Sequence, residues 1–324
     1  MNTRAVARAV EPGAAPVATG GPIFTGWEAR HPTLWGKQPI CLSHRLNEHP
    51  LFSRDNLAGL IERYPAGKYM LVHVGARGQE KEWREGDFGD LSGHEVIAAV
   101  EHGRMWLNLL HVHEVDPRYG DLLDEIFDEL QGYMPEYRTF ARIAGILISS
   151  PEAQVYYHFD TSGQSLWQIA GRKRVYVYPA SPPFLTAPEL ETVCLYNNEV
   201  NINYQPWYDE FASTFEIGPG QMLTWPLNAP HRVENLGFSI SMTIEYSMHD
   251  IRRKLLVNSA NGILRERLGI NPATSISGPA FWAKTALWGA AKLSGVVEAK
   301  RRRRRPITFH LNPTTPGAII EVTQ

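Results

Sequence analysis

Two histidines and one aspartate have the types and spacing to hold a metal ion. His158 and Asp160 are two residues apart in a segment with strand character, and side chains at i and i+2 lie on one face of a strand. A third ligand must then come from a neighbouring strand. His231 is the candidate, because Gly220 and Pro226 set up a turn before it and it opens the next strand.

The His-x-Asp pair alone is a weak signal, since a hydrogen-bonded pair within a sheet has the same spacing. The framework Gly220–Asn235, which delivers His231, favours the metal site instead. Two imidazoles and one carboxylate leave three coordination positions open, as at non-haem Fe(II) sites. A chelating keto acid and O2 would take these positions, so we expect Fe(II) on His158, Asp160 and His231, the residues that would also support catalysis.

A longer stretch resembles a known family. Residues 154–179, QVYYHFDTSGQSLWQIAGRKRVYVYP, look like the signature of the cupin-like JmjC oxygenases, which are related to the asparaginyl hydroxylase-like enzymes. Phe215–Asn235 resembles the closing half of that signature, with Asn228 where glycine is usual. The resemblance covers residues 140–250 and implies a double-stranded β-helix, or jelly-roll, core.

The resemblance also implies 2-oxoglutarate as co-substrate. The lysine that binds its far carboxylate in the family falls on Lys173, and alternation sends Arg172 and Arg174 to the opposite face. Ser241 and Thr243 share a strand face and could donate hydroxyls to the same carboxylate, although ordinary surface hydroxyls would look the same.

The expected reaction is hydroxylation of a C–H bond in a protein or peptide side chain, or in a small amino-acid-like molecule, with release of succinate and CO2. Asp160 is retained, whereas halogenating relatives replace this carboxylate with a small residue. Specificity would lie in the N-terminal third and in the loop Pro182–Trp207, whose polar and aromatic residues suit a substrate cleft. They are Tyr196, Asn197, Asn198, Tyr204, Trp207 and Tyr208, while Gln164, Trp167 and Gln168 are further candidates for the pocket wall.

Two alternatives stay open. A non-enzymatic metal-binding cupin, acting as a ligand-sensing or regulatory module, would not need a buried cation at Lys173. A cupin isomerase or dioxygenase that works without a keto acid would often add a glutamate ligand, and no glutamate lies near His158 in the sequence.

The bulk composition is that of an ordinary globular protein. The chain has 324 residues, of which 43% are hydrophobic and 20% charged, with a net charge of −2. This charge does not favour general attraction to nucleic acid or anionic membranes. Cys41 and Cys194 form no CxxC pair, and no apolar run approaches the roughly 18 residues of a membrane span, so a reducing cytoplasm is the expected setting.

The pattern along the chain predicts a mainly β fold with flanking helices. We expect a flexible leader at 1–20, an N-terminal α/β extension of the barrel at 21–135, the β-helix core at 136–250, helices forming a lid or dimer surface at 251–305, and a tail at 306–324. Eight short strands predict the core. They are Ala144–Ser149, Ala153–Asp160, Ser165–Ala170, Lys173–Tyr178, Ser213–Ile217, Gln221–Trp225, His231–Asn235 and Ser239–Tyr246.

Outside the core, the pattern predicts both strands and helices. The strands are Tyr69–Val74 and Met105–Val115. The helices are one from Ser53 to Arg63, His94–Glu101 after an N-cap at Ser92, Asp121–Leu130, Arg252–Leu268 and Pro279–Lys300.

Three features outside the core could carry other functions. His111 and His113 share a predicted strand with Glu114, and we interpret them as packing or surface residues. The basic run Lys300–Arg305 could bind nucleic acid, but a solvated helix end is the favoured interpretation. Relatives of this family often pair through C-terminal helices, so a homodimer is expected.

Overall fold

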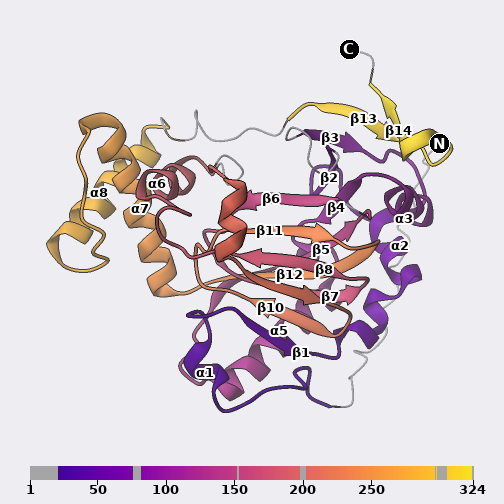
Figure 1. Cartoon of the computed structure of the whole chain (residues 1–324), viewed down its shortest axis with the longest axis horizontal. Helices are drawn as coiled ribbons and strands as arrows, with labels where there is room; N and C mark the ends of the chain where they lie inside the picture. The colour runs from indigo at the N-terminus through magenta and orange to yellow at the C-terminus, as the bar shows by residue number, and fades with distance from the viewer. Residues whose placement is uncertain are drawn as a thin grey trace, which may run out of the picture.

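Two β-sheets form the centre of the protein (Figure 1). The computed structural model describes residues 21–75, 82–151, 153–197, 202–295, 297 and 305–322. The predicted leader at 1–20 and residues 300–304 of the basic run lie outside this part of the chain. The described protein is rich in sheet and carries several helices, as the sequence predicts.

The larger sheet has ten strands in the order β1-β10-β7-β12-β5-β4-β2-β3-β13-β14. Neighbouring strands are antiparallel except β13, which runs parallel to β3. In chain order these strands are β1 (Ile40–Ser43), β2 (Tyr69–Val74), β3 (Trp83–Asp87), β4 (Met105–Leu109), β5 (Phe140–Ser149), β7 (Gly163–Ala170), β10 (Gln221–Thr224), β12 (Ser239–Ser247), β13 (Ile307–Leu311) and β14 (Ile319–Glu321).

The smaller sheet has four antiparallel strands in the order β6-β11-β8-β9. They are β6 (Gln154–His158), β8 (Lys173–Val177), β9 (Ser213–Ile217) and β11 (His231–Asn235). From β5 to β12, successive strands change sheet at every step except from β8 to β9. Leu166 and Leu223 of the larger sheet pack with Val175 and Val233 of the smaller one, so the two sheets face each other across an apolar interior.

Helices cover the outer face of the larger sheet. Apolar residues of α2 (Arg54–Glu62), α3 (Gly93–His102) and α5 (Pro117–Tyr133) pack in one core with Met242 and Ile244 of β12. Two caps fall where the sequence predicts helix starts. The Ser53 hydroxyl accepts a hydrogen bond from the Asn56 amide, and Ser92 forms a capping box with Glu95.

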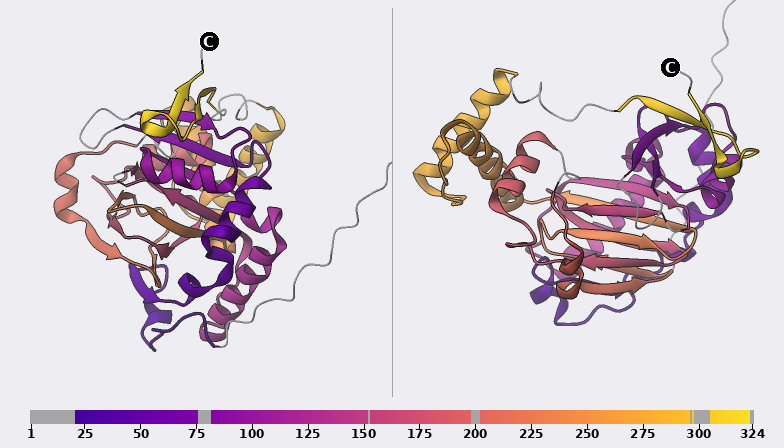
Figure 2. Two further views of the ribbon diagram at one scale, coloured as in Figure 1. Left: turned by 90° about the vertical axis from the view of Figure 1, so that its right-hand side faces the viewer. Right: turned by 45° about the horizontal axis from the view of Figure 1, so that its top comes forward.

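A second helical group stands at one end of the sheets (Figures 1 and 2, red to gold). There α6 (Ala187–Tyr196) packs on α7 (His249–Leu268), and α7 packs on α8 (Gly278–Leu293). Arg265 of α7 pairs with the buried carboxylate of Glu191 in α6 over 2.6 Å. The remaining helices are short: α1 (His31–Leu34), α4 (Val112–Val115), and the 3-10 turns η1 (Leu46–Glu48), η2 (Pro50–Phe52), η4 (Pro206–Phe211) and η5 (Pro316–Ala318). None of the helices that the structure describes combines the length and apolar composition of a bilayer span.

Several predicted bounds are wrong. β4 ends at Leu109, and the chain from His111 forms a turn and α4 instead of continuing as a strand to Val115. The helix predicted to reach Lys300 ends at Leu293, shortly before Gly295 with its left-handed φ of 69°. α6 was not predicted, because it lies inside the segment interpreted as a substrate loop.

The C-terminal strands β13 and β14 lie at the far edge of the larger sheet (Figure 2, yellow). Phe309 of β13 is fully buried and lies over Gly86 of β3, where a Cβ atom would come within 2.2 Å of the ring. Arg305 donates a hydrogen bond to the Trp83 carbonyl over 2.9 Å. The last described segment therefore supports the strand that carries Trp83.

The turn between β7 and β8 depends on a glycine. Gly171 has φ +70°, and a Cβ atom there would lie 2.0 Å from the Phe238 carbonyl oxygen. Replacing Gly171 with alanine is therefore expected to lower the free energy of unfolding by at least about 3 kcal/mol, measured by urea denaturation. Gly269 is the control, since its φ is +67° but no atom lies within 4 Å, and alanine there should cost only about 1–2 kcal/mol. Equal losses at the two positions would contradict the predicted clash.

Candidate metal centre

β6 and β11 bring the predicted ligands together. His158 ends β6 and is paired in register with His231 at the start of β11. The prediction that the strand continues to Asp160 is wrong, because Asp160 lies in the turn that follows. The Asn228 side chain donates to the Asp160 carbonyl over 2.9 Å and ties that turn to the loop before β11. Asn228 has a left-handed φ of 62°, a conformation that glycine and asparagine adopt more readily than other residues.

The side chains of His158, Asp160 and His231 converge. One ligand atom of each lies within 4.8 Å of the other two. His231 Nε2 is 3.4 Å from Asp160 Oδ2, and the two imidazole centroids are 4.2 Å apart. Three ligand atoms at these separations can face one ion.

Backbone carbonyls set the orientation of both rings. His158 Nδ1 lies 2.7 Å from the Tyr156 carbonyl oxygen, and His231 Nδ1 lies 3.1 Å from that of Ala229. A carbonyl oxygen can only accept, so each Nδ1 carries the proton and each Nε2 keeps a free lone pair. This is how second-shell groups commonly fix histidines that bind metals through Nε2.

Two of these residues carry buried polar groups that a bound cation would stabilise. Burial lowers the pKa of His231 well below its usual value, which keeps the imidazole neutral. Burial also raises the pKa of Asp160, whose Oδ2 atom is buried and accepts no hydrogen bond within the described structure. An unpartnered buried carboxylate oxygen is costly, and a bound cation would remove that cost.

These residues line a cavity of about 430 Å³. Lys173 also lines the cavity and is only 1% exposed. It forms no ion pair with a described carboxylate, and burial lowers its pKa to about 7. Arg172 and Arg174 point away and pair with Glu216 at the surface, as alternation predicts. Lys173 lies four positions along β8 from Val177, the residue paired with His231, or roughly 13 Å of strand.

The other predicted binding residues divide between cavity and core. Thr243 and Gln164 line the cavity. Ser241 is fully buried and donates a hydrogen bond to Gln168 Oε1 over 2.8 Å, so its hydroxyl already has an acceptor. Trp167 belongs to the core beneath the helices.

The segment Pro182–Trp207 contributes less to the cavity than predicted. Asn197 lines the cavity, whereas Tyr204 and Tyr208 pack around Tyr157 in a separate aromatic cluster and do not line it. Asn198 lies outside the described residues.

Part of the cavity wall was not predicted. Trp106 and Asn108 of β4 line it, and the indole Nε1 of Trp106 and Oδ1 of Asn108 are buried without a hydrogen-bond partner in the described structure. Gln164 Oε1 is also buried without a hydrogen-bond partner in the described structure. Such polar atoms in a cavity wall are suited to a polar ligand. Their i, i+2 spacing on β4 shows that Trp106 and Asn108 share a face, but nothing local shows that this face meets the metal ligands. The remaining unpredicted wall residues are Met70, Trp83, Leu110, Leu147, Val155, Tyr156, Ser165, Leu166, Trp225, Val233 and Glu245.

A larger cavity of about 630 Å³ adjoins this one and shares Trp225 with it. Its other walls come mainly from the segments 32–37, 133–137 and 246–254, which mix apolar, aromatic and charged residues and include no histidine among the lining residues. The candidate chemistry therefore belongs to the smaller cavity.

Comparisons with known proteins show a shared fold. No protein-family model and no curated protein matches the sequence. Among solved structures, the X-ray structure of E. coli YcfD matches with a TM-score of 0.50 and 17% identity, over 84% of this chain and 69% of that one. A crystal structure of the Escherichia coli ribosomal oxygenase YcfD has a TM-score of 0.49 and 15% identity, over 88% and 74% of the two chains. The structure of YcfD in complex with cobalt and 2-oxoglutarate has a TM-score of 0.47 and 17% identity, over the same 88% and 74%. The chain therefore shares the fold of E. coli YcfD.

Proposed function

We propose that this chain is an Fe(II)- and 2-oxoglutarate-dependent oxygenase that hydroxylates a C–H bond. The observation that carries the proposal is one cavity holding two different sites. His158, Asp160 and His231 bring their ligand atoms within 4.8 Å of one another, and the buried amine of Lys173 forms no ion pair with a carboxylate of the described residues. A structural ion pair would place the lysine against a carboxylate of the chain. No described carboxylate pairs with Lys173, and we propose that a ligand supplies the matching carboxylate.

The strand order supports a double-stranded β-helix for β5–β12. In each sheet the strands are interleaved, with β10-β7-β12-β5 in one and β6-β11-β8-β9 in the other. This arrangement supports residues 136–250 as the catalytic core, with β1 and β2–β4 extending its larger sheet from the N-terminal segment 21–135. The likeness to YcfD is one of fold and is consistent with this core.

The ligand set fits Fe(II). Two imidazoles and one carboxylate leave coordination positions open. Open positions are typical of non-haem Fe(II) sites and not of closed structural metal sites. When bound, the iron with its keto acid and O2 would supply the oxidising chemistry. The chain's own tasks are binding and orientation. Tyr156 and Ala229 hold the two imidazoles through their carbonyls, and Lys173 would neutralise the far carboxylate of 2-oxoglutarate.

The substrate is proposed to be a side chain of a protein or peptide, or a small amino-acid-like molecule. The wall formed by Trp83, Trp106 and Tyr156 would exclude water. Asn108 Oδ1 and Gln164 Oε1, which have no hydrogen-bond partner among the described residues, would orient polar groups of the substrate or co-substrate. Because Asp160 is present, hydroxylation is favoured over halogenation.

The C-terminal helices are proposed as a dimer surface or a lid. Trp282 is 64% exposed and Leu293 92% exposed on α8, and large apolar side chains in such positions often mark contacts between chains. A cytoplasmic setting goes with this proposal, because Fe(II) and free thiols such as Cys41 persist in reducing compartments.

The proposal is tested by adding Fe(II), ascorbate and 2-oxoglutarate to the full chain and following succinate by NMR. Slow, substrate-independent succinate formation is expected, and it should stop when a chelator removes the metal. A protein that binds the metal but neither binds nor consumes 2-oxoglutarate would contradict the oxygenase. That outcome would support the non-enzymatic metal-binding cupin instead.

A further inference from the structure

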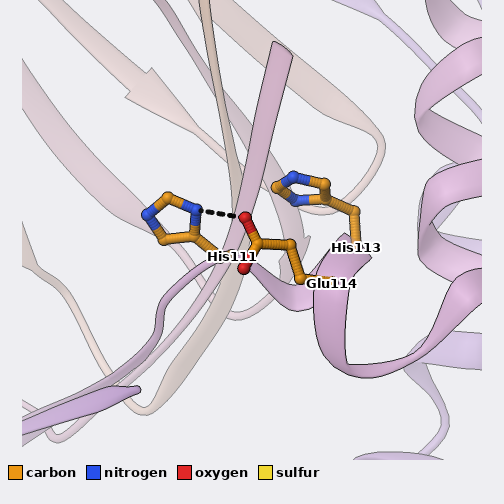
Figure 3. A group of neighbouring side chains, drawn as sticks. All are labelled: His111, His113 and Glu114. Carbon is orange, nitrogen blue, oxygen red and sulfur yellow. Dashed lines mark hydrogen bonds and ion pairs between the residues drawn. The ribbon is translucent and has the colours of Figure 1, made fainter. Parts of the chain in front are cut away.

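A second group of side chains of the types that bind metals lies shortly after β4. His111 and His113 flank the carboxylate of Glu114, as Figure 3 shows. The two rings are nearly parallel, with centroids 5.9 Å apart and planes at 29°. Within the described residues, only this group and the candidate iron centre bring three such ligand atoms within 4.8 Å.

The backbone at His111 is held in an uncommon conformation. Its φ of 56° and ψ of 43° are left-handed, a region that few residues other than glycine adopt. Such conformations cost of order 1 kcal/mol and occur often at functional sites. Here the conformation turns the chain into α4 and places the His111 ring beside Glu114 (Figure 3).

Glu114 is fixed with one oxygen directed at the histidines. Its Oε2 accepts a hydrogen bond from Lys68 Nζ over 3.0 Å, while Oε1 lies 3.2 Å from His111 Nδ1. Lys68 therefore anchors the carboxylate without occupying Oε1. A partner on the far oxygen is how outer-shell groups commonly support a carboxylate ligand.

The His113 ring is positioned by β5. The Ala144 amide donates to His113 Nδ1 over 3.3 Å, slightly longer than the usual range of about 2.7–3.2 Å for N–H···O bonds. An ion at that nitrogen would replace one weak hydrogen bond.

We propose that His111, His113 and Glu114 form a second site for a divalent transition-metal ion of the Zn²⁺ class, separate from the iron centre. The ion would take one nitrogen from each ring and Oε1 of Glu114. Two imidazoles and one carboxylate are a common protein ligand set for Zn²⁺, with a fourth position left for water. His111 and Glu114 are nearly half exposed, so an ion reaches this site without passing through the catalytic cavity.

The experiment counts Zn²⁺ bound per chain after equilibrium dialysis of untagged protein. The wild type should bind two ions, since the candidate iron centre also accepts Zn²⁺. The double variant His111→Ala/His113→Ala should bind one, the double variant His158→Ala/His231→Ala should bind one, and the combined variant none. Glu114→Gln alone should weaken the surface site at least tenfold and leave the other ion in place.

His94→Ala/His102→Ala is the matched control, because it removes two histidines of α3 and should still bind two ions. The proposal is overturned if His111→Ala/His113→Ala binds as many ions as the wild type, or if His158→Ala/His231→Ala binds none. In the second case the surface site fails while the iron centre stands. If instead only the His111/His113 pair controls binding, the iron centre fails.

Discussion

Replacing Asp160 with alanine is expected to reduce Fe(II)-dependent succinate formation more than 100-fold. Asp160 would supply the only carboxylate of the proposed triad, and losing even outer-shell partners of a metal typically costs about 10–100-fold. The measurement is succinate release at saturating 2-oxoglutarate, together with Fe(II) affinity under anaerobic conditions.

A stability measurement separates loss of a ligand from loss of folding. Because Asp160 Oδ2 is buried without a hydrogen bond from any described residue, the metal-free Asp160→Asn variant should be at least as stable as the metal-free wild type. Adding Fe(II) should raise the melting temperature of the wild type and leave the variant unchanged. A variant that is less stable without metal, or that keeps wild-type turnover, would show that Asp160 has a structural role.

Replacing Lys173 with methionine is expected to weaken 2-oxoglutarate binding by about 30-fold or more. Removing one partner of a buried charge pair commonly costs about 2–5 kcal/mol. Methionine fills a similar volume, so the 1% exposed position stays packed and Fe(II) binding should persist. Arg174→Met is the control, since Arg174 pairs with Glu216 at the surface. A Kd within threefold of the wild type for Lys173→Met would remove the co-substrate role.

The same variant has a pH signature. Burial lowers the pKa of Lys173 to about 7 in the ligand-free fold, from 10.5 in the unfolded chain. Between these values the unfolded chain binds the extra proton, so this lysine makes ligand-free stability rise with pH from about 7 to about 10.5. Binding of a carboxylate favours the charged form, so 2-oxoglutarate affinity should fall above pH 7. Lys173→Met should lose both dependences, which calorimetry at pH 7, 8 and 9 can measure.

The sequence predicted the strands of the core well because their signals are local. β9 and β11 have the predicted bounds, and β8 and β10 each differ by one residue. Alternation placed Lys173 on the opposite face from Arg172 and Arg174. The spacing of His158 and Asp160 predicted that their side chains converge, and they do, although Asp160 lies in the segment after β6 and not on a shared strand face.

What the sequence could not predict depends on pairing between distant strands. Trp106 and Asn108 reach the cavity only because β4 pairs with β5, in register with Ser149 and Leu147, respectively. No local pattern encodes that pairing. Ser241 was predicted as a co-substrate contact, but a partner from another strand, Gln168, accepts its hydrogen bond. His111 was assigned to a strand because strand composition does not reveal a single left-handed residue.

The parallel pairing of β13 with β3 also bears on the order of assembly. The hydrogen bond from Arg305 to the Trp83 carbonyl joins residues 222 positions apart in the sequence, and Trp83 lines the cavity. During synthesis β13 leaves the ribosome after every strand that carries a proposed metal ligand. The nascent chain can therefore pair β6 with β11 before Trp83 receives its support. Pairing between strands so far apart in the sequence is slow, so we expect the part of the cavity wall that contains Trp83 to form last. Metal binding during refolding should therefore precede the burial of Trp83.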